Sequence, residues 1–233
     1  MPKLRIGMVL ALIPIFGSCA SLPAKEPPVN LASKIKPGPV VYVALGDSTG
    51  VGQGARQGGY VDRIFRKLLL HRSGSRLVNL CVTGATTRDV LREQLDEGIQ
   101  ANPDLVTLGI GINDIGHGLS LSEFAQNYES ILRRLKKDTQ AVVIVTNIPD
   151  ISSGPRTPVD MRSQYQQMIV DFNQKLEQIA GSTGAIVFDI YTITHQELPS
   201  HPEYFSADGF HPSDAGYELW ADKMWPTLQA VFE

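Results

Sequence analysis

The chain has 233 residues, of which 42% are hydrophobic and 19% are charged, and its formal net charge at pH 7 is −3. A chain of this length and composition can form one globular domain with a sizeable core. The small negative charge and the lack of a basic stripe argue against a nucleic acid partner. No internal repeat of about 20–50 residues is visible, which argues against a repeat protein.

The N-terminal segment has the pattern of an export signal. Two basic residues precede an apolar run, "IGMVLALIPIF", that is short for a bilayer span and contains a proline. The run ends in "GSC", which resembles a bacterial lipobox, in which the cysteine is lipidated and becomes the mature N-terminus. We therefore expect a signal peptide at residues 1–19 and lipidation at Cys19. The small residues around the site leave ordinary cleavage after Ala20 as the alternative.

Residues 20–37 are rich in proline and poor in apolar side chains, so we expect a tether between the membrane and a domain at residues 38–233. The expected location is the bacterial cell envelope, with the domain in the periplasm or at the cell surface. Cys81 is the only other cysteine, so no intramolecular disulfide forms once Cys19 is lipidated. Its apolar surroundings in "RLVNLCV" predict a buried structural thiol. The sequence leaves the oligomeric state open.

Short runs rich in Val, Ile and Leu alternate with longer stretches of helical periodicity. The short runs predict strands covered on both faces, at residues 39–45, 76–80, 104–110, 141–147 and 185–190. The periodic stretches predict helices, at residues 59–71, 87–99, 121–137, 160–181 and 213–231. We expect Trp220 and Trp225, on the last of these helices, to pack in the core.

This alternation predicts an α/β fold, specifically a three-layer α/β/α sandwich with a five-stranded parallel sheet in the flavodoxin-like order 2-1-3-4-5. In such sheets the functional site lies beyond the carboxyl ends of the strands. The residues that follow the predicted strands are therefore the informative ones: Asp47-Ser48, Thr83-Gly84, 111–114, Pro149-Asp150 and the predicted loop at 195–212.

The turn after the first strand, "GDSTGVGQGA", allows two interpretations. Gly50, Gly52 and Ala55 fit the dinucleotide fingerprint G-x-G-x-x-A, which would indicate an oxidoreductase. That interpretation needs an acidic residue at the end of the second strand, where this chain has Asn79 and no acid. In the other interpretation, the turn presents Ser48 as a nucleophile. The absence of an acidic residue after the second strand favours this second interpretation.

A serine hydroxyl is a poor nucleophile unless a base, itself oriented by a carboxylate, takes its proton. The stretch "SADGFHPSD" offers Asp208 and His211, three residues apart. The stretch "NDIGH" offers the same spacing in Asp114 and His117, and it also follows a strand. Spacing alone does not choose between the two pairs.

Motifs from residue 46 to residue 211 occur in a fixed order: "GDS" at Ser48, "VTGATT" with Gly84, "GIND" with Asn113, and "DGFH" with Asp208 and His211. The sequence resembles the GDSL, or SGNH, hydrolase family. The resemblance implies a catalytic triad of Ser48, His211 and Asp208. It also implies an oxyanion hole made by the backbone N–H groups of Ser48 and Gly84 and the side-chain amide of Asn113. One departure is that Thr follows Ser48 where the family commonly has Leu or Ile.

The resemblance implies a serine esterase that hydrolyses carboxylic esters and needs no cofactor. No metal site is predicted, because the chain has neither H-E-x-x-H nor a close pair of histidines. Family members act on lysophospholipids, aryl esters, thioesters and acetylated sugars; we expect a small or short-chain acyl group here. Residues 150–163 are expected to border the acyl site. The alternative function is a non-catalytic binding module on the same fold.

Overall fold

A computed structural model describes residues 35–232. Five parallel strands form one sheet in the order β2-β1-β3-β4-β5, which confirms the predicted flavodoxin-like arrangement. The strands are β1 (Val41–Gly46), β2 (Arg76–Asn79), β3 (Leu105–Gly109), β4 (Val142–Thr146) and β5 (Ile186–Phe188). The expected signal peptide, Cys19 and most of the expected tether lie outside the described residues. Ile35, within the expected tether, is buried and donates its N–H to the carbonyl of Val231 at 2.8 Å.

The register brings the carboxyl ends of the central strands level with one another. Gly46, the last residue of β1, pairs with Gly109, the last residue of β3, and Gly109 pairs with Thr146, the last residue of β4. The segments that follow these strands therefore emerge side by side at one edge of the sheet.

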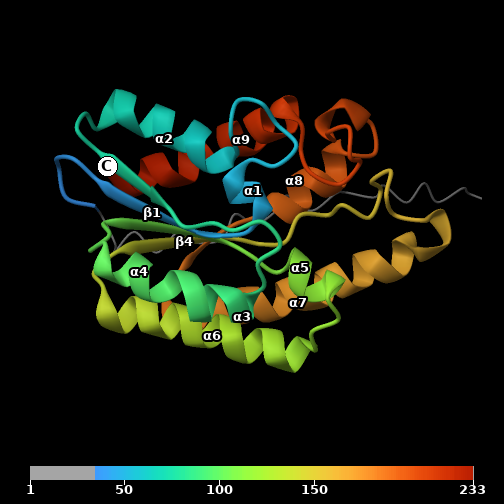
Figure 1. The fold of residues 1–233 in the computed structure, drawn as a ribbon, viewed down its shortest axis with the longest axis horizontal. Helices are drawn as coiled ribbons and strands as arrows, with labels where there is room; N and C mark the ends of the chain where they lie inside the picture. Colours follow the sequence, from blue (N-terminus) through green and yellow to red (C-terminus); the bar gives the residue numbers. More distant parts are fainter. Residues whose placement is uncertain (1–34, 233) are drawn as a thin grey trace, which may run out of the picture.

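Helices cover both faces of the sheet (Figure 1). One face is covered by α2 (Tyr60–His71) and α9 (Asp214–Phe232). The other is covered by α4 (Leu95–Gln100), α6 (Leu121–Asp138) and α7 (Arg162–Thr183). The predicted helix at 87–99 is divided into α3 (Thr87–Asp89), the π-helical turn η1 (Val90–Gln94) and α4. In the part of the chain that the structure describes, no helix has the length and apolarity of a membrane span.

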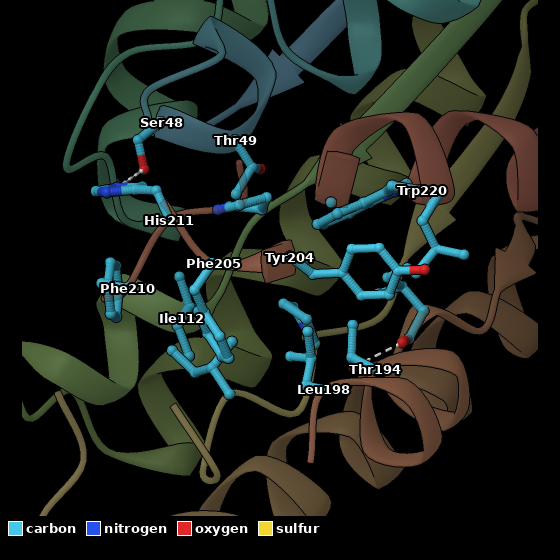
Figure 2. Close-up of a pocket in the computed structure, with 16 residues that line it drawn as sticks. Ser48, Thr49, Ile112, Thr194, Leu198, Tyr204, Phe205, Phe210, His211 and Trp220 are labelled. Carbon is cyan, nitrogen blue, oxygen red and sulfur yellow. Dashed lines mark hydrogen bonds between the residues drawn. The ribbon is translucent and has the colours of Figure 1, made fainter. Parts of the chain in front are cut away.

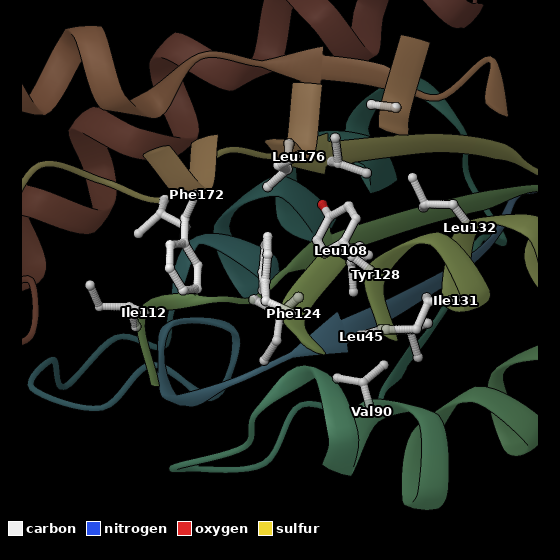
Figure 3. Packing of buried hydrophobic residues seen from close by; sticks show 14 of the residues in the cluster. Leu45, Val90, Leu108, Ile112, Phe124, Tyr128, Ile131, Leu132, Phe172 and Leu176 are labelled. Atoms are coloured by element: carbon white, nitrogen blue, oxygen red, sulfur yellow. The ribbon is translucent and has the colours of Figure 1, made fainter. Parts of the chain in front are cut away.

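Alternate residues of β1 supply two separate hydrophobic cores, one on each face of the sheet. Val43 and Leu45 belong to the core under α6 and α7, where Leu45 lies near Phe124 and Tyr128 of α6 (Figure 3). Tyr42 and Ala44 point the opposite way and belong to the core under α2 and α9. Successive strand residues face opposite sides of a sheet. Burial on both faces therefore explains why these strands read as continuous apolar runs.

Short helices follow three of the strands. They are α1 (Ser48–Val51) after β1, α5 (Ile112–Gly116) after β3, and α8 (Ile190–Glu197) after β5. The prediction of a loop from residue 195 is wrong at its start, because α8 extends to Glu197. Asp189 begins α8 by accepting a hydrogen bond from the backbone N–H of Thr192. Two 3₁₀ turns complete the fold, η2 (Val159–Met161) and η3 (Pro202–Tyr204).

Candidate active site

Ser48 is the first residue of α1 and lies directly beyond the carboxyl end of β1. The strand ends at Gly46, where a Cβ would lie 2.3 Å from the carbonyl oxygen of Gly109, so only glycine allows β1 and β3 to approach this closely. Asp47 then caps α1 by accepting hydrogen bonds from the backbone N–H and the hydroxyl of Thr49, at 2.9 and 2.8 Å. The cap turns the chain sharply and leaves Ser48 at the edge of the sheet.

Asp47 is a buried carboxyl group beneath the proposed nucleophile. Its side chain is only 3% exposed. Burial raises its pKa to about 6, although the two hydrogen bonds from Thr49 act in the opposite direction. The turn that presents Ser48 therefore contains a carboxyl group whose ionisation is made unfavourable by burial.

The structure brings His211 and Asp208 to Ser48 from a loop more than 150 residues away. Nε2 of His211 lies 3.0 Å from Oγ of Ser48 (Figure 2). Nδ1 of His211 lies 2.6 Å from Oδ2 of Asp208. With Nδ1–H donating to the carboxylate, Nε2 is left to accept the hydrogen of the Ser48 hydroxyl. The sequence interpretation named these three residues, and the fold joins them in one chain of hydrogen bonds.

Hydrogen bonds within the loop that carries Asp208 and His211 fix its conformation. The backbone N–H of Ser206 donates to the carbonyl of His211 at 2.8 Å. Oδ1 of Asp208 accepts from the backbone N–H groups of Phe210 and His211, each at 2.9 Å. Burial acts to raise the pKa of Asp208, but the hydrogen bonds from the His211 side chain and from these two N–H groups outweigh it and bring the pKa well below its usual range. The carboxylate beside the imidazole is therefore ionised at neutral pH.

The other D-x-x-H pair is not assembled in this way. Asp114 is fully buried and accepts hydrogen bonds from the backbone N–H of Thr87, at 3.0 and 3.2 Å to its two oxygens. Burial raises its pKa. His117 is exposed beyond the end of α5, and within residues 35–232 no hydrogen bond joins it to Asp114. Asp114 thus fastens α5 to α3, and His211 is the histidine that meets Ser48.

The residues expected to form an oxyanion hole follow three different strands. Asn113 lies in α5, and its Nδ2 donates to the carbonyl of Ala85 at 2.9 Å, which ties α5 to the segment that carries Gly84. Gly84 adopts a φ of 81°, a conformation that favours glycine. Within residues 35–232, the backbone N–H groups of Ser48 and Gly84 donate to no protein acceptor. Among the described residues, both N–H groups and the second amide hydrogen of Asn113 therefore have no protein acceptor.

A narrow apolar cavity of about 40 Å³ adjoins Ser48 and His211. Figure 2 shows residues of its wall. Ile112 belongs to α5, Leu198 directly follows α8, and Tyr204 and Phe205 come from the segment before His211. Ile151, from the segment 150–163 that we expected near the acyl site, also lines it. Nothing in the sequence pattern singled out Leu198, Tyr204 or Phe205, because a cavity wall has no periodicity of its own.

Trp220 has a double role that the sequence did not indicate. It is 3% exposed and stacks on Tyr60, with ring centroids 4.9 Å apart, which agrees with the predicted packing role. It also lines the cavity next to Ser48 (Figure 2). The ring therefore joins the core under α2 and α9 to the candidate site.

The remaining predictions concern Cys81 and metals. Cys81 is half-buried rather than buried, and burial raises the pKa of its thiol well above the usual value. A Cβ at Gly50 would lie 2.3 Å from its Sγ, so the glycine after Thr49 leaves room for this sulfur. In the described part of the chain, no three His, Cys, Asp or Glu side chains gather as a metal site.

Comparisons with known proteins bear on the family and the fold of this chain. The sequence model of the GDSL-like lipase/acylhydrolase family matches residues 44–219. An acetylxylan esterase of Geobacillus stearothermophilus is 28% identical over 157 residues, which cover 64% of this chain and 69% of that protein. The spore germination lipase LipC of Bacillus licheniformis is 28% identical over 210 residues, 78% of this chain and 93% of that one. The crystal structure of the Geobacillus stearothermophilus acetylxylan esterase Axe2 superposes with a TM-score of 0.69 at 24% identity, covering 86% of this chain and 97% of that chain.

Proposed function

The chain belongs to the GDSL-like lipase/acylhydrolase family of serine ester hydrolases, and from this premise we propose that Ser48, His211 and Asp208 form its catalytic triad. The observation that carries the proposal is the chain of hydrogen bonds from Ser48 Oγ to His211 Nε2, at 3.0 Å, and from His211 Nδ1 to Asp208 Oδ2, at 2.6 Å. An activated serine needs this order of groups.

In the proposed mechanism, Oγ of Ser48 attacks the ester carbonyl while Nε2 of His211 takes the hydroxyl proton. The tetrahedral intermediate collapses as His211 returns the proton to the leaving alkoxide, which leaves an acyl group on Ser48. A water molecule then repeats the sequence and releases the carboxylic acid. Asp208, ionised because of its low pKa, holds the imidazole tautomer and stabilises the imidazolium in both steps.

Ser48, Gly84 and Asn113 are proposed to stabilise the oxyanion of the intermediate. Support comes from the unpaired backbone N–H groups of Ser48 and Gly84 and from the free amide hydrogen of Asn113. The bond from Asn113 to Ala85 fixes the amide before substrate arrives. A preorganised donor of this kind is typically worth about 10²–10³ in kcat.

The acyl group is proposed to be small, such as acetyl, and to enter the cavity beside Ser48. The supporting observation is the volume of about 40 Å³. Pockets that bury a drug-sized ligand have volumes of about 300–1,000 Å³, so this much smaller cavity favours a short acyl chain. Its apolar wall suits the methyl end of a short chain. A relative named acetylxylan esterase is consistent with this choice.

The test is turnover of 4-nitrophenyl esters of acetate, butyrate and octanoate, before and after treatment with a serine-directed phosphonate. We expect kcat/KM to be highest for acetate or butyrate and at least tenfold lower for octanoate. The phosphonate should abolish turnover and add its mass to the peptide that contains Ser48. Turnover that survives full labelling of Ser48 would contradict the triad. A preference for octanoate would contradict the short-acyl assignment alone.

A further inference from the structure

A second hollow shares Phe210 with the cavity. It is a groove of about 510 Å³, and its wall comes from the segment before and within the first turns of α7, including Arg156, Met161 and Tyr165. Phe210 lines both hollows, and its ring stands edge-on to the His211 imidazole, with centroids 4.9 Å apart and planes at 88°. The two hollows therefore share a residue whose ring contacts the proposed base.

The two hollows suit the acyl and the alcohol portions of an ester. This step rests on the proposed function. When the carbonyl carbon is at Ser48, the acyl chain and the alcohol portion must extend in different directions. The cavity of about 40 Å³ is the smaller of the two hollows and suits a short acyl chain. The groove of about 510 Å³ has room for a bulky alcohol portion. The alcohol also receives its proton from His211, and the groove begins at the neighbour of that residue.

The groove carries one formal charge, and it is positive. Arg156 is exposed, and within residues 35–232 it forms no ion pair. The other wall residues are neutral: Thr157, Pro158, Met161, Gln164, Tyr165, Met168 and Phe210. No carboxylate of the wall competes for the guanidinium.

Two contacts hold Arg156 in relation to the catalytic loop. Its backbone N–H donates to the carbonyl of Gly209 at 3.3 Å, between Asp208 and Phe210. Its guanidinium carbon lies 5.6 Å from the centroid of the Phe210 ring. A guanidinium resting on an aromatic face keeps its outward N–H groups free for a carboxylate or a phosphate.

We propose that the groove binds the alcohol portion of the ester and that Arg156 selects alcohols that carry an anionic group, either a carboxylate or a phosphate. Arg156 is a specificity residue in this assignment, because it contacts the departing half of the substrate and takes no part in bond breaking.

The experiment compares matched acetate esters that differ in the charge of the leaving alcohol. 4-Acetoxybenzoate releases an anionic phenol and 4-acetoxybenzamide a neutral one; the acetyl esters of glycerol 3-phosphate and of glycerol form a second pair. The measured quantity is kcat/KM for the ester of the anionic alcohol divided by kcat/KM for the ester of the neutral alcohol. It is determined in the wild type and in Arg156→Gln. Comparing ratios cancels differences in intrinsic reactivity. We expect the wild-type ratio to exceed that of Arg156→Gln by about five- to tenfold.

Three further measurements separate charge recognition from a purely structural role. Arg156→Lys should keep part of the preference, because the positive charge remains. Raising the ionic strength to about 1 M should reduce the wild-type preference, since screening weakens an exposed ion pair. Arg133→Gln, in α6, removes another exposed cation, one that does not line the groove, and should leave both the ratio and the activity unchanged. A packing role of Arg156 would lower kcat/KM for both members of a pair and leave their ratio intact.

The two pairs distinguish the source of the anion, and a preference in either supports the proposal. Equal ratios in the wild type and Arg156→Gln for both pairs would overturn it. If the wild type hydrolyses none of these esters, the proposed function is wrong, and the groove is then tested by binding alone. In that case NMR titration of Ser48→Ala with 4-hydroxybenzoate should show weaker binding when Arg156→Gln is added; equal binding would overturn the assignment.

Discussion

His211 and His117 test the triad at the scale of single residues. His211 reaches Ser48 through a 3.0 Å contact, whereas His117 is exposed beyond the end of α5. We expect His211→Ala to lower kcat by about 10³-fold or more, and Ser48→Ala with His211→Ala to be little worse than either change alone, because triad members act as a unit. His117→Ala should keep activity within about tenfold. An inactive His117→Ala alongside an active His211→Ala would contradict the assignment.

Asn113 provides a second test, of transition-state stabilisation. Because an oxyanion exists only during reaction, we expect Asn113→Ala to lower kcat by about 10²-fold with little change in KM. Asn113 also donates to Ala85, so the thermal midpoint should be measured with the kinetics. A change in KM alone would mean that the amide binds the ground-state substrate.

Asp47 makes stability depend on pH. Burial raises its pKa from 3.8 to about 6, so the folded state binds the proton more tightly than the unfolded chain does. The stability from this group is therefore fully present below about pH 3.8 and is lost as pH rises through about 6. Above that pH the ionised form costs up to about 3 kcal/mol.

Asp47→Asn keeps an oxygen acceptor for Thr49 and removes the charge. We expect Tm at pH 8 to rise by about 5 °C or more, and the difference to vanish near pH 4. Thermal unfolding followed by circular dichroism at both pH values measures this. A Tm that falls at pH 8 would show that the ionised carboxylate stabilises the turn.

At the scale of elements, the contact between β1 and β3 sets the position of the nucleophile. Gly46 has a φ of 153°, and a Cβ there would lie 2.3 Å from the carbonyl oxygen of Gly109. Gly46→Ala should therefore destabilise the fold by more than about 2 kcal/mol and displace Ser48. Gly181 is the matched control, because it lies inside α7 with nothing within 4 Å of its Cβ position.

Gly181→Ala should raise the free energy of unfolding by up to about 1 kcal/mol, since alanine is the better helix former. Urea denaturation of both variants gives the comparison. Equal stability of Gly46→Ala and the wild type would mean that the strands can separate at this point without loss.

The long elements could be predicted from sequence and the short ones could not. Each strand is buried on both faces, so it appears as an unbroken apolar run, and α6 and α7 are long enough to show helical periodicity. By contrast, α1 and α5 have only four and five residues, too few for a period to show. α1 is fixed by a local cap, Asp47, whereas α5 is fixed by the bond from Thr87 to Asp114, a distant partner that the linear sequence does not reveal.

The residues of the candidate site also differ in whether the sequence could predict them. Ser48, Asp208 and His211 lie in motifs after strands, so the fold class already placed them at one edge of the sheet. The choice of His211 over His117 required the resemblance, because both pairs have the same spacing. Arg156 sits in a loop with no motif, and only its packing against Phe210 and Gly209 relates it to the site.

At the scale of the whole molecule, the site and the start of the described chain lie at opposite ends. α9 begins three residues after His211 and runs for 19 residues, a length of about 28 Å. Ile35 donates its N–H to Val231, near the far end of this helix. In Figure 1, α1 and α5 lie at one end of the sheet and the C-terminus at the other. A chain entering at Ile35 therefore enters on the side away from Ser48.

This geometry makes the proposed lipid on Cys19, which lies outside the described residues, compatible with an open active site. We propose that Cys19 anchors the domain in the cell envelope. Cys19→Ser should then move the protein from the membrane fraction to the soluble fraction with kcat/KM unchanged, because the described chain begins at Ile35, on the side of the domain away from Ser48. Cys81→Ser is the control and should stay with the membrane. The mass of the mature N-terminal peptide decides between the two cleavage sites, since cleavage after Ala20 would remove Cys19 altogether. If Cys19→Ser remained in the membrane fraction, attachment would have to come from a part of the chain other than this cysteine.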